Sequence, residues 1–558
     1  MKNTQQGYFV KRAAVLFVSL LATTFISQFS LSTSHSIEQN IEVQLLGIND
    51  FHGQIDTSKK VNNRSAGRAD YLAAYLKERE RTNPNTLLVH AGDAVGGSSP
   101  SSALLQDEPA IHMLNELGFD VGTVGNHEFD EGVQEMMRLI DGGKHPKTAK
   151  RYGEFQGANF PYAVANVVDK DTNKTILDPY VIKEVKGKKI GFIGVVYSDT
   201  PNILDSSKVK DVKFTDEVTA INKYSKELKD QGIEAIVVLA HNPGKSEIDG
   251  SKPTGEIVDF ARQVDDEVDV IFGAHNHTYL NSVVDGKLLV QAYSAGTAFA
   301  DVDLVIDAAT GDIIEKKAEI IVTYQDAIEA DRQMTEIVAA YQEDVSETIH
   351  EKIGETGVEL TRGQNAAGES DFGTLIADSM RHTMNTDFAF IESAGIRADL
   401  DAGPITWGEL FTALPFGNRL MSLTMTGSQV RDALNQQWSP KKRMLQISGL
   451  KYTWSNELPA GQKVVDIYLP TGEKINPDSE YSVAVNTFLA MGKDNFTAFT
   501  NGKNRVKGPV DLDALTGYVE AQPKPIIASA GSRVTKLNNE FVLAPKVDLY
   551  GAVVSNEP

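Results

Sequence analysis

Residues 41–53 read IEVQLLGINDFHG, in which an apolar run stops at the polar residues Asn49, Asp50 and His52. A short apolar run bounded by turn-forming residues predicts a buried β-strand with a loop at its carboxyl end. The pattern recurs four times further along the chain. The apolar runs are residues 86–91, before Gly92-Asp93; 121–124, before Gly125-Asn126-His127-Glu128-Phe129-Asp130; 235–240, before His241; and 268–272, before Gly273-Ala274-His275-Asn276-His277. Each predicted strand therefore ends on a potential ligand.

The stretches between these runs are amphipathic or loop-like as far as about residue 323, which predicts an α/β domain. Ligand sites of α/β sheets lie at the carboxyl ends of strands, so the five ends can converge on one place. One Asp, Asn or His after a strand is usually a turn former or a helix cap. A shared site is favoured because eight such residues fall in these five places, while the whole chain has only 11 His. They are Asp50, His52, Asp93, Asn126, His127, His241, His275 and His277.

The chemistry of this set narrows the kind of ligand. Carboxylate, amide oxygen and imidazole without thiolate suit Zn, Mn, Co or Fe, rather than copper(I) or an iron–sulfur cluster. The chain has no cysteine, so neither a disulfide framework nor a lipid-modified cysteine is available. The sequence therefore predicts a site for divalent metal ions and leaves the identity of the metal open.

The charge of the chain limits its partners. The formal net charge of −22 disfavours binding along duplex nucleic acid or on an anionic membrane, because both need clustered Lys and Arg. A small anionic substrate is compatible with this charge, since metal ions and a few arginines correct the local potential.

The N-terminus predicts export from the cytoplasm. Lys2, Lys11 and Arg12 precede an apolar run that extends from Ala13 to about Phe29, in the order of a secretory signal. The alternative is an anchor that stays attached, but the run is short for a membrane span and a polar stretch follows it. We expect residues 1–36 to be a signal peptide, with no stable membrane insertion after its removal and a secreted or extracytoplasmic mature protein.

The ligand motifs resemble a known family. Asp50-x-His52, Gly92-Asp93, Gly125-Asn126-His127-Glu128 and Gly273-x-His275-x-His277, in this order, resemble the calcineurin-like metallophosphoesterase signature, and residues 49–53 resemble its 5′-nucleotidase branch. The resemblance implies that residues 41–323 form a four-layer domain, a β-sandwich flanked by helices, with two divalent metal ions. It further implies that Asp50, His52 and His277 hold one ion and that Asn126, His241 and His275 hold the other. Asp93 would bridge the ions, and His127 and Asp130 would form a catalytic dyad.

A connector follows this region. Met334, Val338, Tyr341, Val345 and Ile349 recur at spacings of three and four among acidic residues and Gln, which predicts an amphipathic helix. We expect it to occupy residues 324–352 and to separate the metal half from a second folded region, residues 353–547.

The second region is similar to the 5′-nucleotidase C-terminal domain. The matching segments are Glu369-Ser370-Asp371-Phe372-Gly373, Gly395-Ile396-Arg397, Pro415-Phe416-Gly417-Asn418 and Phe488-Leu489-Ala490-x-Gly492-x-Asp494. The resemblance implies an α+β nucleotide-binding domain in which Phe416 and Phe488 sandwich the base. Asp494 would then accept hydrogen bonds from the ribose, Arg397 would hold the phosphate, and Asn418 would add a further contact.

Two positions depart from that family's usual pattern. Glu392 stands five residues before Arg397, where the family often has Asn, and Gly368 stands where it often has Arg. Arg362 is close enough in sequence to replace the missing arginine. These departures leave the preferred nucleotide open.

The resulting prediction is a two-metal enzyme that converts 5′-nucleotides such as AMP to nucleoside and phosphate. Alternatives on the same scaffold are a 2′,3′-cyclic-nucleotide phosphodiesterase with 3′-nucleotidase activity, a nucleotide-sugar hydrolase and a broad phosphatase. A non-enzymatic binding protein that keeps metals for stability is disfavoured, because it would not need the dyad of His127 and Asp130.

Overall fold

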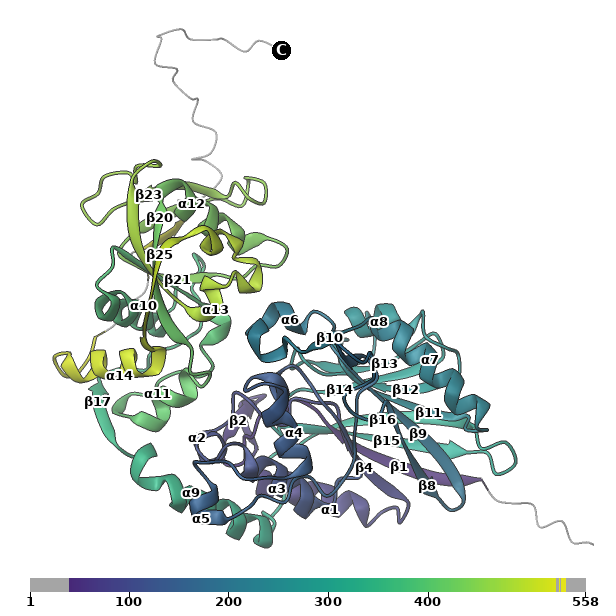
Figure 1. The fold of residues 1–558 in the computed structure, drawn as a ribbon. Helices are drawn as coiled ribbons and strands as arrows, with labels where there is room; N and C mark the ends of the chain where they lie inside the picture. The colour runs from purple at the N-terminus through teal and green to yellow at the C-terminus, as the bar shows by residue number, and fades with distance from the viewer. Residues whose placement is uncertain (1–39, 528–530, 532, 538–558) are drawn as a thin grey trace, which may run out of the picture. The chain divides into compact units, whose positions relative to one another are not determined.

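A computed structural model describes residues 40–527, 531 and 533–537 (Figure 1). The predicted signal peptide, residues 1–36, lies outside the described residues. Within the described ranges, no helix combines the length and the apolar character needed to cross a membrane.

Two six-stranded sheets form the first half of the chain. The first has the order β16-β15-β1-β4-β5-β6, in which β1, β4, β5 and β6 are parallel and β15 and β16 are antiparallel additions. Its strands are β1 (Ile41–Ile48), β4 (Thr86–His90), β5 (Val121–Thr123), β6 (Tyr162–Ala163), β15 (Ala298–Ile306) and β16 (Ile313–Val322).

The second sheet has the order β13-β14-β12-β11-β9-β8, with a parallel centre and an antiparallel strand at each edge. Its strands are β8 (Tyr180–Val185), β9 (Lys188–Val196), β11 (Ala235–His241), β12 (Val268–Phe272), β13 (Tyr279–Val284) and β14 (Lys287–Ala292). The five runs that predicted strands are thus β1, β4, β5, β11 and β12, and all five end where the sequence turns polar.

The two sheets pack face to face. Val43 and Val302 from the first sheet share a buried cluster with Val237 and Val290 from the second. Side chains of β1 alternate between this interior and the outer face, because successive residues of a strand point to opposite sides. Leu46, for example, belongs to the outer cluster.

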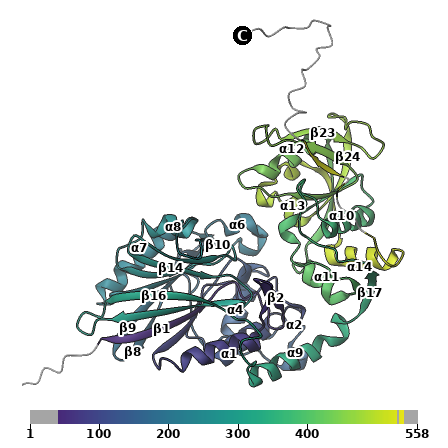
Figure 2. The ribbon, with the colours of Figure 1, turned by 180° about the vertical axis from the view of Figure 1, so that it is seen from behind.

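Helices cover both outer faces, as Figure 1 and Figure 2 show from opposite sides. The first sheet is covered by α1 (Ala69–Glu80), α3 (Glu108–Leu117), α4 (Val133–Asp141) and α9 (Arg332–Ile349), and the second by α7 (Glu217–Asp230) and α8 (Glu256–Ala261). The prediction of a four-layer domain, helices around a β-sandwich, is confirmed.

Smaller elements connect these layers. They are β2 (Ser58–Val61), β3 (Arg64–Gly67), α2 (Pro100–Ala103), η1 (His127–Phe129), α5 (Ala149–Tyr152), β7 (Val167–Asp169), α6 (Thr200–Ile203), η2 (Ser206–Val209) and β10 (Val212–Phe214).

Helix α9 lies between the two halves of the chain in sequence. It begins after Asp331, whose side chain accepts a hydrogen bond from the Met334 N–H at the first turn. Met334, Val338 and Val345 are buried along one face of the helix, and Met334 and Val338 pack with α1 and α3 in the outer cluster of the first sheet.

The C-terminal region contains a mixed five-stranded sheet of order β21-β18-β24-β20-β25. Its strands are β18 (Phe388–Glu392), β20 (Arg419–Thr426), β21 (Leu445–Ser448), β24 (Glu480–Asn486) and β25 (Lys503–Val510). Two smaller sheets pair β17 (Lys352–Thr356) with β19 (Gly403–Thr406), and β22 (Lys451–Trp454) with β23 (Val464–Tyr468) and β26 (Val534–Lys536).

Helices lie on both faces of this mixed sheet, so the predicted α+β architecture of the C-terminal domain is confirmed. One face carries α10 (Asp371–Met384), α11 (Trp407–Ala413) and α14 (Asp511–Ala521), and the other carries α12 (Gly427–Asn435). Short helical turns complete the domain: η3 (Ser393–Gly395), η4 (Gln436–Trp438), α13 (Thr487–Ala490), η5 (Lys493–Asn495) and η6 (Thr497–Asn501).

Candidate metal centre

The carboxyl ends of five strands bring the seven predicted ligands into one buried site. Asp50 and His52 follow β1, Asp93 follows β4, Asn126 follows β5, His241 ends β11, and His275 and His277 follow β12. The site spans both sheets, because β1, β4 and β5 belong to the first sheet while β11 and β12 belong to the second.

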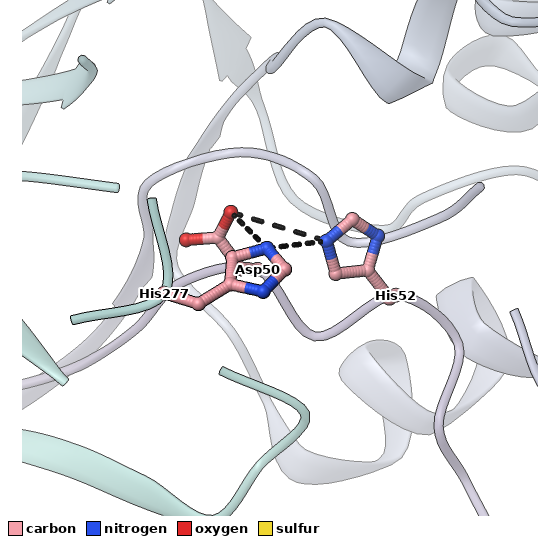
Figure 3. A group of neighbouring side chains, drawn as sticks. All are labelled: Asp50, His52 and His277. Atoms are coloured by element: carbon pink, nitrogen blue, oxygen red, sulfur yellow. Dashed lines mark hydrogen bonds and ion pairs between the residues drawn. The ribbon is translucent and has the colours of Figure 1, made fainter. Parts of the chain in front are cut away.

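Asp50, His52 and His277 form the first group, with their polar atoms facing one another (Figure 3). The Nε2 atoms of His52 and His277 are 3.0 Å apart, and His277 Nε2 lies 3.3 Å from Asp50 Oδ1. Asn49 supports the carboxylate through its Nδ2 group, which donates to Asp50 Oδ2 at 2.6 Å. Three ligand atoms therefore converge on one point.

Asp93, His241 and His275 form the second group, and Asn126 joins it. Asn126 Oδ1 lies 3.2 Å from His241 Nε2 and 2.8 Å from His275 Nδ1. This arrangement places an amide oxygen, two imidazole nitrogens and a carboxylate around a second point.

Asp93 lies between the two groups. Its Oδ2 atom is 3.1 Å from His241 Nε2 and 3.8 Å from His52 Nε2. Only 1% of Asp93 is exposed, so the carboxylate faces the site and not solvent. Asp93 is thus within 4 Å of a histidine from each group.

Backbone carbonyls orient two of the imidazole rings. His52 Nδ1 lies 2.7 Å from the Gly96 carbonyl oxygen, and His241 Nδ1 lies 2.9 Å from the Ala91 carbonyl oxygen. Because a carbonyl oxygen can only accept, each Nδ1 carries a proton, which leaves Nε2 as the nitrogen directed at the site.

The backbone at the site is strained. Asp50, His52, Asp93, His275 and His277 all have a positive φ, between 49° and 77°. Residues other than glycine rarely adopt this left-handed region, and such strain persists only where the surroundings fix it. Five of the seven predicted ligands are thus held in place at a conformational cost.

The electrostatics fit a cation site. Burial lowers the pKa of His52 and holds the pKa of His275 at about 3, so both rings are neutral and can ligate. Burial raises the pKa of Asp50, but the neighbouring His277 outweighs it and the pKa is about 2. Burial lowers the pKa of His241, but Asp93 outweighs it and raises the pKa to about 9, so this ring would release its Nε2 proton on binding a cation. Ionised carboxylates, an amide oxygen and imidazoles within ligand distance suit two divalent cations.

His127 and Asp130 lie at the rim of the site. His127 Nδ1 is 2.7 Å from Asp130 Oδ2, and the rings of His127 and His52 are 5.0 Å apart. Burial lowers the pKa of His127, but the carboxylates of Asp130 and Asp93 outweigh it and raise the pKa to about 9. Bound cations would act in the opposite direction.

Glu128 supports the site, and sequence reasoning gave it no role. Its carboxylate accepts hydrogen bonds from the N–H groups of Asp93 at 3.0 Å, Ala94 at 2.8 Å and Gly125 at 2.5 Å. It therefore ties the loop after β4 to the loop after β5. The one feature of the sequence that could have indicated this role is the position of Glu128 in the Gly125-Asn126-His127-Glu128 motif.

Two of the predicted substrate-binding residues lie beside the metal centre. The Phe416 ring stacks on the His127 ring, with centroids 5.7 Å apart and an interplanar angle of 14°. The Arg397 guanidinium carbon is 5.7 Å from the centre of the same Phe416 ring. Arg362 Nη1 donates to the Ile396 carbonyl oxygen at 3.1 Å, next to Arg397. In the described part of the chain, neither arginine pairs with a carboxylate.

The other three predicted residues, Asn418, Phe488 and Asp494, lie directly before β20, in α13 and in η5. The Asn418 and Thr487 side-chain oxygens are 3.3 Å apart, which joins the Phe416 loop to the start of α13, the helix of Phe488. Phe488 is half-buried and makes no ring contact within the described residues. Asp494 forms an ion pair with Arg443, a partner that sequence reasoning missed.

Each half of the chain matches a known protein family. Residues 43–279 match the family described as calcineurin-like phosphoesterase, and residues 352–501 match the 5′-nucleotidase C-terminal domain. The chain belongs to the 5′-nucleotidase family. Its first half accordingly has the domain of metal-dependent phosphoesterases, and its buried Asp and His clusters have the composition of the two-metal site of such enzymes.

Two proteins and one solved structure illustrate how similar this chain is to other proteins. Endonuclease YhcR of Bacillus subtilis is 43% identical over 507 residues, which cover 89% of this chain and 41% of that protein. Cell wall protein Lmo0130 of Listeria monocytogenes is 35% identical over 564 residues, which cover 92% of this chain and 71% of that protein. The crystal structure of a 5′-nucleotidase precursor from Thermus thermophilus is 27% identical, with a TM-score of 0.75, and the match covers 89% of this chain and 100% of that one.

Proposed function

We propose that this protein hydrolyses nucleotide phosphate esters, with 5′-nucleotides such as AMP as the main substrates and nucleoside and phosphate as products. The observation that carries the proposal is the contact between Phe416 and His127. It joins an aromatic ring suited to a nucleobase with a histidine at the rim of a two-metal site. Flat aromatic faces bind any base by stacking, so a substrate with both a base and a phosphate matches this site.

In this proposal Asp50, His52 and His277 hold one cation, and Asn126, His241 and His275 hold the other. Asp93 contacts both, as its distances to His52 and His241 support. When bound, two divalent cations supply a nucleophile at neutral pH and offset the charge of the phosphoryl oxygens. Zn, Mn, Co and Fe all suit this donor set.

His127 and Asp130 are the proposed catalytic dyad. Asp130 accepts from Nδ1 of His127, which leaves Nε2 free to donate a hydrogen bond to a phosphoryl oxygen or a proton to the leaving group. The ion pair with Asp130 supports this role, because the carboxylate favours the protonated ring.

The proposed substrate residues are Arg397 for the phosphate, Phe416 and Phe488 for the base, Asp494 for the ribose and Asn418 as a further contact. Arg362 replaces the arginine that the family often has at the position of Gly368. Its hydrogen bond to the peptide before Arg397, with no carboxylate partner in the described chain, supports a share in phosphate binding.

We further propose a division of labour between residues 41–323, which carry out hydrolysis, and residues 353–547, which choose the substrate, with residues 324–352 as connector. The mature protein acts outside the cytoplasm. The signal-like residues 1–36 and the relative named as a cell wall protein support this location.

Phosphodiester cleavage is the second candidate, and one observation favours it. A relative that is 43% identical is named an endonuclease, although this chain covers only 41% of its length. A 2′,3′-cyclic-nucleotide phosphodiesterase or a nucleotide-sugar hydrolase would use the same metal centre.

A substrate panel tests the proposal. Metal-reconstituted protein is assayed on AMP, ADP, 2′,3′-cyclic AMP, a nucleotide sugar, a short single-stranded oligonucleotide and a phosphate monoester that lacks a base. We expect kcat/KM to be highest for AMP. A higher value for the cyclic ester or the oligonucleotide would establish the second candidate, and equal values for AMP and the base-free ester would indicate a general phosphatase.

A further inference from the structure

Glu392 is buried at the carboxyl end of β18, where two of the proposed substrate-binding segments meet. Only 4% of the residue is exposed. Strand β18 pairs in parallel with β24, so the two strands end at the same edge of the sheet. Asn486 is the last residue of β24, and only 1% of it is exposed. Glu392 therefore faces Asn486 away from bulk water.

A chain of hydrogen bonds leads from Glu392 to the ring of Phe488. Asn486 Nδ2 donates to both carboxyl oxygens of Glu392, at 3.1 and 3.2 Å. The other side-chain atom, Asn486 Oδ1, accepts from the N–H of Leu489 at 2.9 Å and so caps α13. Helix α13 is only four residues long and includes Phe488. Its position thus depends on the orientation of one amide group, which Glu392 sets.

The same carboxyl group also contacts the turn that carries Arg397. A Cβ atom added to Gly395 would lie 2.6 Å from Glu392 Oε1, closer than any side chain tolerates. The carboxyl group is therefore in contact with the backbone two residues before Arg397. One buried group thus touches the segment proposed for the phosphate and, through Asn486, the segment proposed for the base.

No cation compensates a charge on Glu392 in the described part of the chain. The titratable group that faces it is another acid, Asp511 at the start of α14, of which 3% is exposed. Arg397, in the adjoining turn, directs its guanidinium to the Phe416 ring. Burial raises the pKa of Glu392 to about 7, and burial together with Glu392 raises the pKa of Asp511 to about 8.

We infer that Glu392 is a positioning residue for nucleotide binding: while ionised, it accepts from Asn486 at both oxygens and thereby holds the Phe488 helix in place, and its protonation loosens them. The ionised carboxylate accepts at both oxygens, whereas one oxygen of the protonated group carries a proton, so protonation weakens the hydrogen bonds from Asn486. The inference rests on the proposed function, because it requires a base on Phe488. The consequence is nucleotide binding that weakens as pH falls through about 7.

The test measures KM for AMP and for a base-free alkyl monoester, ribose 5-phosphate, between pH 5.5 and 8.5. The ratio of the two KM values removes the ionisation of phosphate and of the metal centre, which both substrates share. In the wild type we expect this ratio to fall by roughly tenfold from pH 5.5 to pH 8.5, because stacking is partly lost while Glu392 is protonated. In Glu392→Gln, whose amide stays neutral, the ratio should not change with pH.

Asp269→Asn is the matched control. Asp269 is a buried carboxyl group of the first domain, where it binds Lys316, and burial raises its pKa to about 6. This variant should keep the pH dependence of the wild type. The control shows whether the loss of pH dependence is specific to Glu392 or follows from the removal of any buried carboxyl group.

Two results would overturn the inference. One is a pH-independent ratio in the wild type, which decides the matter even if Glu392→Gln does not fold. The other is a ratio of KM values in Glu392→Gln that changes with pH as it does in the wild type, with the same offset at every pH. A merely structural role of Glu392 predicts that result. Failure of the proposed function is a different result: the base-free ester would be cleaved and AMP would be neither cleaved nor bound at any pH.

Discussion

The metal centre takes its side chains from five strand ends in two sheets, whereas the proposed nucleotide-binding residues lie on a loop, a turn and short helices of one domain. The proposed ligands Asp50, Asp93 and His241 are almost completely buried, and their loops are strained or braced. Phe416 and Phe488, which we call the clamp, are half-buried on less regular backbone. A rigid centre suits a fixed pair of cations, and a more exposed clamp can differ between relatives that share the chemistry.

The largest effect is expected from removing the shared ligand of the rigid region. Asp93→Ala takes a ligand from both cations, so the protein should lose most of its metal and essentially all turnover of AMP and of the base-free ester. Metal analysis beside phosphate release measures this. Asp259→Ala, at an exposed carboxylate of the same domain, is the control. Two ions per chain with near-normal rates in Asp93→Ala would disprove the shared position.

A smaller effect, still on both substrates, is expected at the rim of the centre. His127→Ala should lower kcat by about 10²–10⁴-fold and leave metal content and KM nearly unchanged, because a proton donor acts in the transition state. Steady-state kinetics with metal analysis separates the outcomes. Loss of metal would make His127 a ligand, and an unchanged kcat would remove it from the mechanism.

The clamp should respond differently from the centre. Stacking contributes about 1–3 kcal/mol per base, so Phe488→Ala should raise KM for AMP by roughly tenfold to a hundredfold. The base-free ester should be affected far less, since Phe488 makes no ring contact to the metal centre within the described chain. Phe416→Ala is expected to affect both substrates, because its ring also packs on His127. Equal losses in Phe488→Ala would contradict the separation of roles.

The smallest effect concerns the stability of the clamp domain. Because the folded protein raises the pKa of Glu392, the folded state is favoured below the ordinary pKa of a glutamate and loses this advantage as pH rises through about 7. Glu392→Gln removes the penalty. Its Tm should exceed that of the wild type by a few degrees at pH 8.5 and match it near pH 4.5. Thermal unfolding at the two pH values checks this, and an equal difference at both would contradict it.

Local patterns made much of the metal centre predictable. An apolar run that ends in Asp, Asn or His can be seen within ten residues or so, and the rule for strand ends then brings distant runs together. The structure places strands at all five runs, and Asp50, His52, Asp93, Asn126, His241, His275 and His277 face one another there. On the basis of this geometry, we propose that these seven residues are the metal ligands.

Contacts without a local pattern could not be predicted. Glu128 binds the Asp93 and Ala94 N–H groups, which lie 35 and 34 residues away in sequence. Asn486, the partner of Glu392, is 94 residues away from it. The sequence marked Glu392 as unusual, but only the pairing of β18 with β24 reveals what it touches. The stacking of Phe416 on His127 depends likewise on the packing of two separate domains.

The central claim is that the metal centre performs the chemistry and the clamp selects the nucleotide. A double-mutant cycle of His127→Ala and Phe488→Ala, measured as kcat/KM on AMP and on the base-free ester, tests it most directly. Independent roles predict that the two losses on AMP multiply, to within about twofold, and that Phe488→Ala adds almost nothing to the loss on the ester. A combined loss on AMP no greater than that of His127→Ala alone, or an equal effect of Phe488→Ala on both substrates, would contradict the claim.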